Sequence, residues 1–226
     1  MKLGQKAMEA LRAEITGELK AGDDLVVAGD IALSGTALIT EKEKETLKSY
    51  FSEGFLWDAQ RSPSLYGAYD AEVLLGDREN LTCEQMNGRK RACAEKSSVW
   101  EAARNMGADA LYVLGTGGVL AGLWKMAEAG ETGIQADLRK IPVRQETIEI
   151  CEFFDLNPYK LLSGGSLLLA AADGNALVHA IRQAGEEAVI IGRTIDSNDR
   201  VLINGEERRF LETTQTDELW NMVKCN

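Results

Sequence analysis

The first twenty residues place an apolar side chain at every fourth position. The series is Leu3, Ala7, Leu11, Ile15 and Leu19, and this spacing keeps the five side chains on one side of a helix. We therefore predict a helix over residues 3–20, ended by the turn Gly22-Asp23-Asp24. The apolar run that follows, Leu25 to Ala28, has the length of a buried strand.

Residues 35–98 are helical at first and irregular afterwards. Residues 35–50 are rich in Lys and Glu at helical spacing, and residues 51–60 continue the helix after a break. Residues 63–98 form the least regular part of the chain. We expect its first portion to be partly helical and its second portion to be a loop.

Beyond residue 97, short helices and strands alternate regularly. Ser97 or Ser98 is placed to cap a helix that Gly107 ends. The patterns predict strands over residues 110–114, 133–138, 166–171 and 188–194, and helices over residues 100–106, 117–129, 144–154, 174–184 and 217–224. Residues 201–204 and 208–211 flank Asn204-Gly205, which is a strong short hairpin signal. This alternation predicts an α/β domain in which helices pack in layers on a mixed sheet.

The composition is typical of a folded protein of the cytoplasm. The chain has 226 residues, of which 45% are hydrophobic, and this length allows a sizeable core in one or two domains. No apolar run approaches the roughly 20 residues of a membrane span, and the charged start does not match a signal peptide. We therefore expect no membrane partner, a cytoplasmic location and four reduced cysteines.

The net charge of −11 argues against nucleic acid as a partner, because Lys and Arg supply most phosphate contacts. The best candidate for a local basic patch is Arg89-Lys90-Arg91. It stands in a polar stretch without apolar periodicity, residues 77–98. We interpret the triplet as part of a solvated loop rather than as a phosphate site.

Four segments of the chain occur in an order that can be recognised. They are Gly117-Gly118, residues 141–157 (IPVRQETIEICEFFDLN), residues 162–170 (LSGGSLLLA) and residues 189–209 (VIIGRTIDSNDRVLINGEERR). Together they resemble the C-terminal domain of the aminoimidazole ribonucleotide (AIR) synthetase superfamily, specifically its hydrogenase maturation factor-like members. Residues 22–56 look like the family's entry into that domain, so the resemblance extends over residues 22–222. It implies a PurM-like C-terminal domain of the α/β (α+β) class, with a mixed β-sheet flanked by helices.

The resemblance also implies that a domain is missing. Full-length relatives carry an N-terminal domain of about the same size, which holds the groups that bind ATP and magnesium. Residues 1–21 precede the matching region here and contain no such motif. We expect an N-terminal helix over residues 1–21 and an AIR synthase-related C-terminal-type domain over residues 22–226, with an irregular segment around residues 63–98 and no N-terminal ATP-binding domain. No cofactor is then expected for the isolated chain, and ATP with magnesium is expected only if a partner domain exists.

The turn formed by Gly115, Thr116, Gly117 and Gly118 is the first candidate ligand site. It joins a predicted strand to a predicted helix, where glycines let the backbone approach a ligand and free N–H groups attract an anion. Tight turns use glycine for steric reasons about as often. Relatives read His-Asp-Val-Thr-Glu before the two glycines, whereas this chain reads Tyr112, Val113, Leu114, Gly115 and Thr116. The loss of the histidine and both acidic groups favours structure over catalysis.

The loop formed by Ser163, Gly164, Gly165 and Ser166 is the second candidate. In the family the corresponding loop faces the cleft between two domains, and its hydroxyl groups and bare backbone would suit a phosphate or carboxylate. The alternative is a connector built from turn residues. Asn157 also matches the family and is included as a ligand-binding candidate.

The remaining histidine and cysteine residues give no sign of catalysis. His179, the only histidine, has no carboxylate or serine at a spacing that would recruit it. Cys151 lies among apolar helix residues and is predicted to pack, while Cys83 and Cys93 are too far apart to form a zinc-binding pair.

Three aspartates lie at the ends of the first predicted strand. Asp23, Asp24 and Asp30 carry carboxylates of the kind that hold magnesium. A solvated turn and a helix stop explain them more simply. We therefore predict neither a catalytic residue nor a metal site.

Two classes of function fit these observations. The first is a stand-alone binding or assembly module that forms a homodimer and lacks ATPase activity of its own. The second is a subunit of an ATP-dependent, hydrogenase maturation factor-like enzyme, completed by a separate ATP-binding-domain protein. The missing half and the altered residues 112–116 favour the first, whereas the intact segments within residues 141–170 favour the second.

Overall fold

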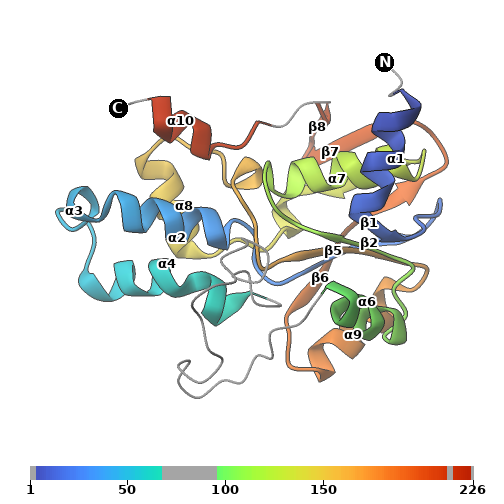
Figure 1. Ribbon diagram of the computed structural model, residues 1–226, viewed down its shortest axis with the longest axis horizontal. Coiled ribbons are helices and arrows are strands. Elements are labelled where there is room, and N and C mark those ends of the chain that lie inside the picture. Colours follow the sequence, from blue (N-terminus) through green and yellow to red (C-terminus); the bar gives the residue numbers. More distant parts are fainter. Residues whose placement is uncertain (1–3, 68–95, 213–215, 225–226) are drawn as a thin grey trace.

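The computed structural model describes residues 4–67, 96–212 and 216–224. The described strands form one eight-stranded sheet in the order β1-β3-β5-β2-β6-β4-β7-β8, with helices on both faces (Figure 1). They are β1 (Ile15–Gly17), β2 (Asp24–Ala28), β3 (Ala110–Val113), β4 (Gly133–Asp137), β5 (Leu167–Ala171), β6 (Ala188–Ile195), β7 (Arg200–Asn204) and β8 (Glu207–Phe210). β4 and β7 pair in parallel, and the other neighbours pair antiparallel. The predicted layered α/β fold with a mixed sheet is confirmed.

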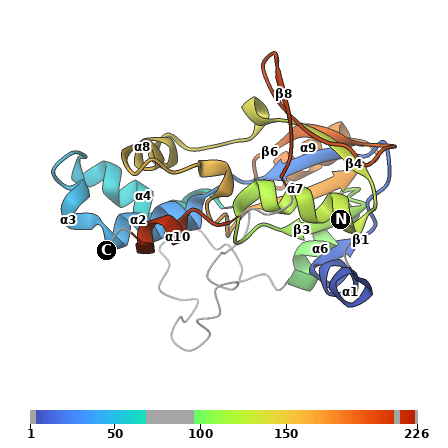
Figure 2. The same cartoon turned by 90° about the horizontal axis from the view of Figure 1, so that it is seen from above.

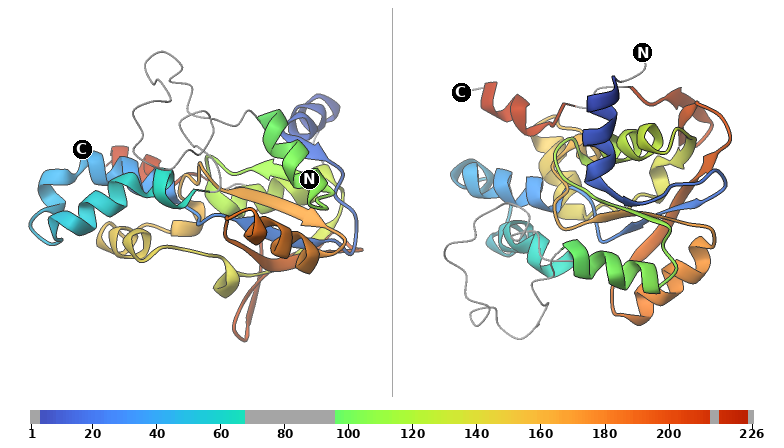
Figure 3. Two further views of the ribbon diagram at one scale, coloured as in Figure 1. Left: turned by 90° about the horizontal axis from the view of Figure 1, so that it is seen from below. Right: turned by 45° about the vertical axis from the view of Figure 1, so that its right-hand side comes forward.

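All the described helices except α10 fall into three groups around this sheet. The described helices are α1 (Gln5–Glu14), α2 (Leu33–Lys42), α3 (Lys44–Leu47), α4 (Glu53–Tyr66), α6 (Lys96–Asn105), α7 (Gly118–Ala129), α8 (Gln145–Phe153), α9 (Gly174–Gln183) and α10 (Leu219–Lys224), with the 3-10 turns η1 (Leu138–Lys140) and η2 (Pro158–Lys160). α1 and α7 cover one face of the sheet, and α6 and α9 cover the other (Figure 3). α2, α3, α4 and α8 lie together at one end of the molecule (Figure 2).

The central strand β2 serves two cores at once. Leu25 and Val27 belong to the core beneath α7, whereas Val26 and Ala28 belong to the core beneath α9. Successive side chains of a strand point to opposite faces, and both faces of this sheet are covered. Side chains on both faces of β2 must therefore be apolar, which explains why polar and apolar residues do not alternate along this strand.

The N-terminal helix is shorter than the periodicity predicts. α1 ends at Glu14, and Ile15–Gly17 pairs with β3, with Ile15 opposite Tyr112. A three-residue edge strand has no pattern of its own, and its pairing partner lies far along the chain. The prediction of helix over residues 15–20 was wrong for this reason.

The predicted helical region after residue 35 is divided into α2, α3 and α4. α4 continues through Pro63, which lacks the N–H that would normally bond to the carbonyl of Ala59. The hydroxyl of Ser62 donates to that carbonyl instead, at 2.9 Å. The first portion of residues 63–98 is therefore helical, as predicted, while residues 68–95, with Cys83, Arg89-Lys90-Arg91 and Cys93, lie outside the described residues.

Helix α6 begins one turn before the predicted start. Ser97 and Ser98 therefore lie within the helix rather than just before it, because the position of a serine alone does not determine where a helix begins. Gly107 follows the helix with a φ of 100°, a conformation that suits glycine, and this end was predicted correctly.

Candidate functional site

The two glycine-rich turns predicted as ligand sites lie side by side. The N–H of Ser163 donates to the carbonyl of Gly115 at 3.2 Å, and the N–H of Leu114 donates to the carbonyl of Ser166 at 3.0 Å. The end of β3 meets the start of β5 here, because the two strands are antiparallel neighbours. The structure thus brings together two segments that are about fifty positions apart.

The loop Ser163–Ser166 is buried along its whole length. The Oγ of Ser163 accepts a hydrogen bond from the N–H of Ala32 at 2.9 Å. The Oγ of Ser166 donates to the carbonyl of Asp30. Both hydroxyl groups therefore hold the segment that leads from β2 into α2.

The N-terminus of α7 binds a carboxylate from the C-terminal segment. Oδ2 of Asp217 accepts a hydrogen bond from the N–H of Gly117 at 2.7 Å, and Oδ1 accepts from the N–H of Leu219 at 3.0 Å. Asp217 is only 3% exposed. Unpaired N–H groups at a helix start attract anions, and here the chain supplies the anion itself.

Gly117 and Gly118 also have a steric role. Their φ angles are 81° and 66°, in the left-handed region that favours glycine. A Cβ at position 118 would lie 2.4 Å from the carbonyl oxygen of Tyr159. Packing therefore excludes a side chain at this position. Thr116, in the same turn, is exposed.

Asn157 lies apart from these hydroxyl groups. Its Oδ1 accepts from the N–H of Tyr159 at 3.0 Å and caps η2. The residue lines a groove that Tyr159 and the β7–β8 hairpin also line. The third predicted ligand residue is therefore part of a different surface feature.

A polar cluster around Arg144 was missed by the sequence analysis. The guanidinium lies 3.7 Å from the centre of the Tyr66 ring, and its Nε donates to Oε2 of Glu146 at 3.3 Å. Burial raises the pKa of Asp30, which faces this cluster, although the charge of Arg144 opposes the shift. Arg144 belongs to the recognised IPVRQET segment, so the family resemblance could have drawn attention to this residue. No local feature of the sequence indicates that Tyr66, Glu146 and Asp30 are its neighbours.

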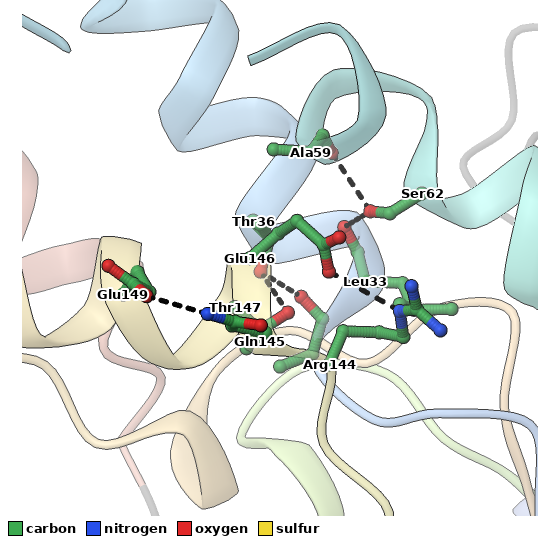
Figure 4. Close-up of polar contacts among 10 residues, drawn as sticks. Leu33, Thr36, Ala59, Ser62, Arg144, Gln145, Glu146, Thr147 and Glu149 are labelled. Atoms are coloured by element: carbon green, nitrogen blue, oxygen red, sulfur yellow. Dashed lines mark hydrogen bonds and ion pairs between the residues drawn. The ribbon is translucent and has the colours of Figure 1, made fainter. Parts of the chain in front are cut away.

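The same region joins α8 to α2 and α4 (Figure 4). The hydroxyl groups of Thr36 and Thr147 lie 2.9 Å apart, and both residues are fully buried. The hydroxyl of Ser62 also contacts the carbonyl of Leu33 at 3.2 Å. Buried hydroxyls need such partners, and together they fix the helices beside the loop Ser163–Ser166.

The three aspartates considered for magnesium do not converge. Asp23 accepts from the N–H of Lys20 at 2.8 Å and is 3% exposed, whereas Gly22 in the same turn is exposed, so the turn is solvated as expected but the Asp23 side chain is buried. Asp24 accepts from the N–H of Gly174 at 3.1 Å. Within residues 4–67, 96–212 and 216–224, no group of three or more His, Cys, Asp or Glu side chains could hold a metal ion.

His179 and Cys151 have contrasting environments. His179 is exposed on α9. Cys151 is buried in the core, as predicted, and burial raises the pKa of its thiol to about 12. A thiol with so high a pKa carries almost no thiolate near neutral pH and is a poor nucleophile.

Solved structures with this fold include hydrogenase maturation proteins. E. coli HypE matches with a TM-score of 0.62 and 21% identity over 89% of this chain and 52% of that chain. A HypE–HypF complex matches with a TM-score of 0.58 and 18% identity, covering 86% and 54%. Thiamine-monophosphate kinase from Stenotrophomonas maltophilia K279a matches with a TM-score of 0.53 and 18% identity, covering 84% and 52%.

Sequence comparison gives the family. A phosphoribosylformylglycinamidine synthase subunit PurL from Methanopyrus kandleri is 27% identical over 99 residues, which are 42% of this chain and 13% of that protein. The chain thus spans a small part of this curated relative and about half of the HypE chains. The described helices include none with the length and apolarity to cross a membrane. Residues 84–204, more than half of the chain, match the model of the AIR synthase related protein, C-terminal domain, and the chain therefore belongs to this family.

Proposed function

We propose that this chain is a binding or assembly module of the AIR synthase-related type and that it neither binds nor hydrolyses ATP by itself. The hydrogen bond between Asp217 and Gly117 carries the proposal. The N–H of Gly117, which would attract an anion at the start of α7, is already paired with a buried carboxylate. A cytoplasmic location and the absence of a nucleic-acid partner stay predictions from composition.

The resemblance places the groups that bind ATP and magnesium in the N-terminal domain of relatives, and the start of α7 in this chain is not a substitute for them. A phosphate at the start of α7 would have to displace Asp217, and a buried carboxylate that loses its partner costs about 1–3 kcal/mol or more. The hydroxyls of Ser163 and Ser166, the other candidate phosphate donors, donate within the protein, to the carbonyl of Leu161 at 2.9 Å and to the carbonyl of Asp30. The two side-chain hydroxyls and the N–H of Gly117 are therefore already used within the protein.

Isothermal titration with magnesium and ATP tests the proposal. We expect no binding to the parent chain, whereas binding at micromolar strength would contradict a non-enzymatic module. The variant Asp217→Asn provides the matched control, because it keeps the shape of the side chain and removes its charge. Binding of ATP to this variant alone would identify the Asp217 carboxylate as the group that closes the site.

We infer further that the module is a homodimer. Five aromatic side chains form a cluster between the start of α4 and the end of α8: Tyr50, Phe51, Phe55, Phe153 and Phe154. The rings of Tyr50 and Phe153 lie 4.7 Å apart, and the two residues are 69% and 36% exposed. Exposed aromatic surface of this kind marks interaction sites, and a two-fold axis would place the cluster of one copy against that of the other.

Light scattering tests this inference. The parent chain should have the mass of a dimer, and the double variant Tyr50→Ser with Phe153→Ser should be monomeric. Phe210→Ser is the control, because Phe210 is 71% exposed but lies on the β7–β8 hairpin. A parent chain that stays monomeric at all accessible concentrations would rule out the homodimer.

A second candidate function is a subunit completed by a separate ATP-binding protein. The observation that favours it is the extent of the match, which covers 89% of this chain but 52% of E. coli HypE. Under this alternative, ATP hydrolysis appears only when this chain is mixed with an ATP-binding-domain protein encoded in a neighbouring reading frame. Hydrolysis that needs both chains would favour the subunit over the module.

A further inference from the structure

A groove of about 400 Å³ lies between η1, η2 and the β7–β8 hairpin. The hairpin projects from the body of the molecule and forms one wall (Figure 2). Sites for small molecules usually measure about 300–1,000 Å³. The groove therefore has the size of a small-molecule site, and neither candidate function uses it.

The pairing of β7 with β8 decides which side chains face the groove. Leu202 lies opposite Arg209, and Asn204 lies opposite Glu207. Residues opposite each other, and residues two apart, share one face of a sheet. These four side chains therefore form one surface, and all four line the groove.

The floor of the groove is apolar and its rim is rich in hydrogen-bond donors. Leu138 and Leu202 are 4% and 2% exposed, and the half-buried Tyr159 lies beside them. The Oδ1 of Asn157 is occupied by the cap of η2. Its Nδ2 makes no hydrogen bond within the part of the chain that the structure describes, which leaves that group as a donor on the rim.

An unpaired positive charge lies at this groove, although the chain as a whole carries −11. Arg209 lines it, is exposed and forms no ion pair with any other described residue. Arg208 also borders the groove, but it lies opposite Ile203 and therefore on the other face of the hairpin. Arg209 acts on the phenol of Tyr159: burial raises the pKa of Tyr159, and Arg209 opposes that shift. Arg209 and Tyr159 both line the groove. Glu207 is the only acidic side chain among the described lining residues.

We propose that this groove binds a small organic anion in which a carboxylate or phosphate is joined to a flat apolar group. Arg209 and the Nδ2 group of Asn157 hold the anionic end, because charge-assisted hydrogen bonds to such oxygens are the strongest ones available on the rim. Tyr159 and Leu202 contact the flat end. This site is independent of ATP binding and of the dimer.

Phenyl phosphate is the probe, because it joins one phosphate to one ring, and inorganic phosphate and phenol supply each part alone. Titration of the labelled parent protein, followed by amide NMR, should shift the signals of Asn157, Tyr159, Lys160 and residues 202–209. Phenyl phosphate should bind about tenfold more tightly than either part, as expected when two weak contacts act together. No shifts at millimolar probe, or shifts confined to other residues, would overturn the proposal.

Two variants and one control separate the groove from general charge attraction. Arg209→Gln removes the charge, and Asn157→Asp keeps the oxygen that caps η2 while it replaces the donor with a negative acceptor. Each should weaken phenyl phosphate binding about tenfold. Arg193→Gln removes the same charge from an exposed position on β6 and should leave binding unchanged. Equal affinity in all three variants, with unchanged melting profiles, would refute the site.

Discussion

Asp217 and Gly117 are joined by a hydrogen bond of 2.7 Å although 100 positions separate them along the chain. The same carboxylate accepts from the N–H of Leu219, so it sets the start of α10 as well as filling the N-terminus of α7. One side chain thus ties the C-terminal segment to the glycine-rich turn. The contact should therefore stabilise the fold and also prevent another anion from binding to the N–H of Gly117.

Replacing this carboxylate should destabilise the fold. Asp217→Ala leaves the N–H of Gly117 without its partner, and we expect a loss of about 1–3 kcal/mol in the free energy of unfolding. Urea denaturation measures it. Asp196→Asn, at an exposed position, is the control and should change stability little. Equal stability of Asp217→Ala and the parent would show that the contact contributes nothing.

A methyl group at position 118 should be poorly tolerated. Gly118→Ala combines a left-handed backbone with a Cβ 2.4 Å from the carbonyl oxygen of Tyr159, and we expect a loss of roughly 2 kcal/mol or more. Gly54→Ala is the matched control, because nothing lies within 4 Å of its Cβ and the residue is helical. That variant should be neutral or stabilised by up to about 1 kcal/mol. Melting curves that rank the two variants the other way would contradict the steric role.

Asp30 should make stability depend on pH in a defined direction. Burial raises its pKa in the folded state above the ordinary value of 3.8. The folded state then holds the proton more tightly than the unfolded state, so this residue's contribution to stability falls as the pH rises through the window that begins near 3.8. The variant Asp30→Asn lacks the carboxyl group that binds this proton, so it lacks this contribution to the pH dependence. Relative to the parent, the variant should gain stability between about pH 4 and pH 7 in urea denaturation, and a relative loss would reverse the assigned shift.

Cys151 should resist alkylation in the folded protein. Its pKa of about 12 leaves almost no thiolate near pH 8, and the residue is 1% exposed. Iodoacetamide followed by peptide mass mapping should label Cys151 only after denaturation. Labelling of this residue at the same rate in native and denatured samples would show that the core around it opens freely.

Much of the fold could be predicted because its signals are local. The apolar runs of β2 and β5 are long enough to predict a strand without any tertiary information, and Asn204-Gly205 predicts the β7–β8 turn. Gly107 ends α6 through its own backbone preference. The order of the four recognised segments gave the family, and the match over residues 84–204 agrees.

The candidate sites depended on contacts that no local pattern contains. The sequence by itself determined that the chain turns at two glycine-rich segments, one with Gly115, Gly117 and Gly118 and one with Gly164 and Gly165. Only the tertiary structure decided that Asp217 fills one turn, that Ser163 and Ser166 are bonded internally, and that Asn157 faces a groove with Arg209. Local periodicity reflects which face of a helix or strand is buried. The contacts of Asp217, Ser163, Ser166 and Asn157 depend instead on how segments distant in the sequence pack together in the folded protein.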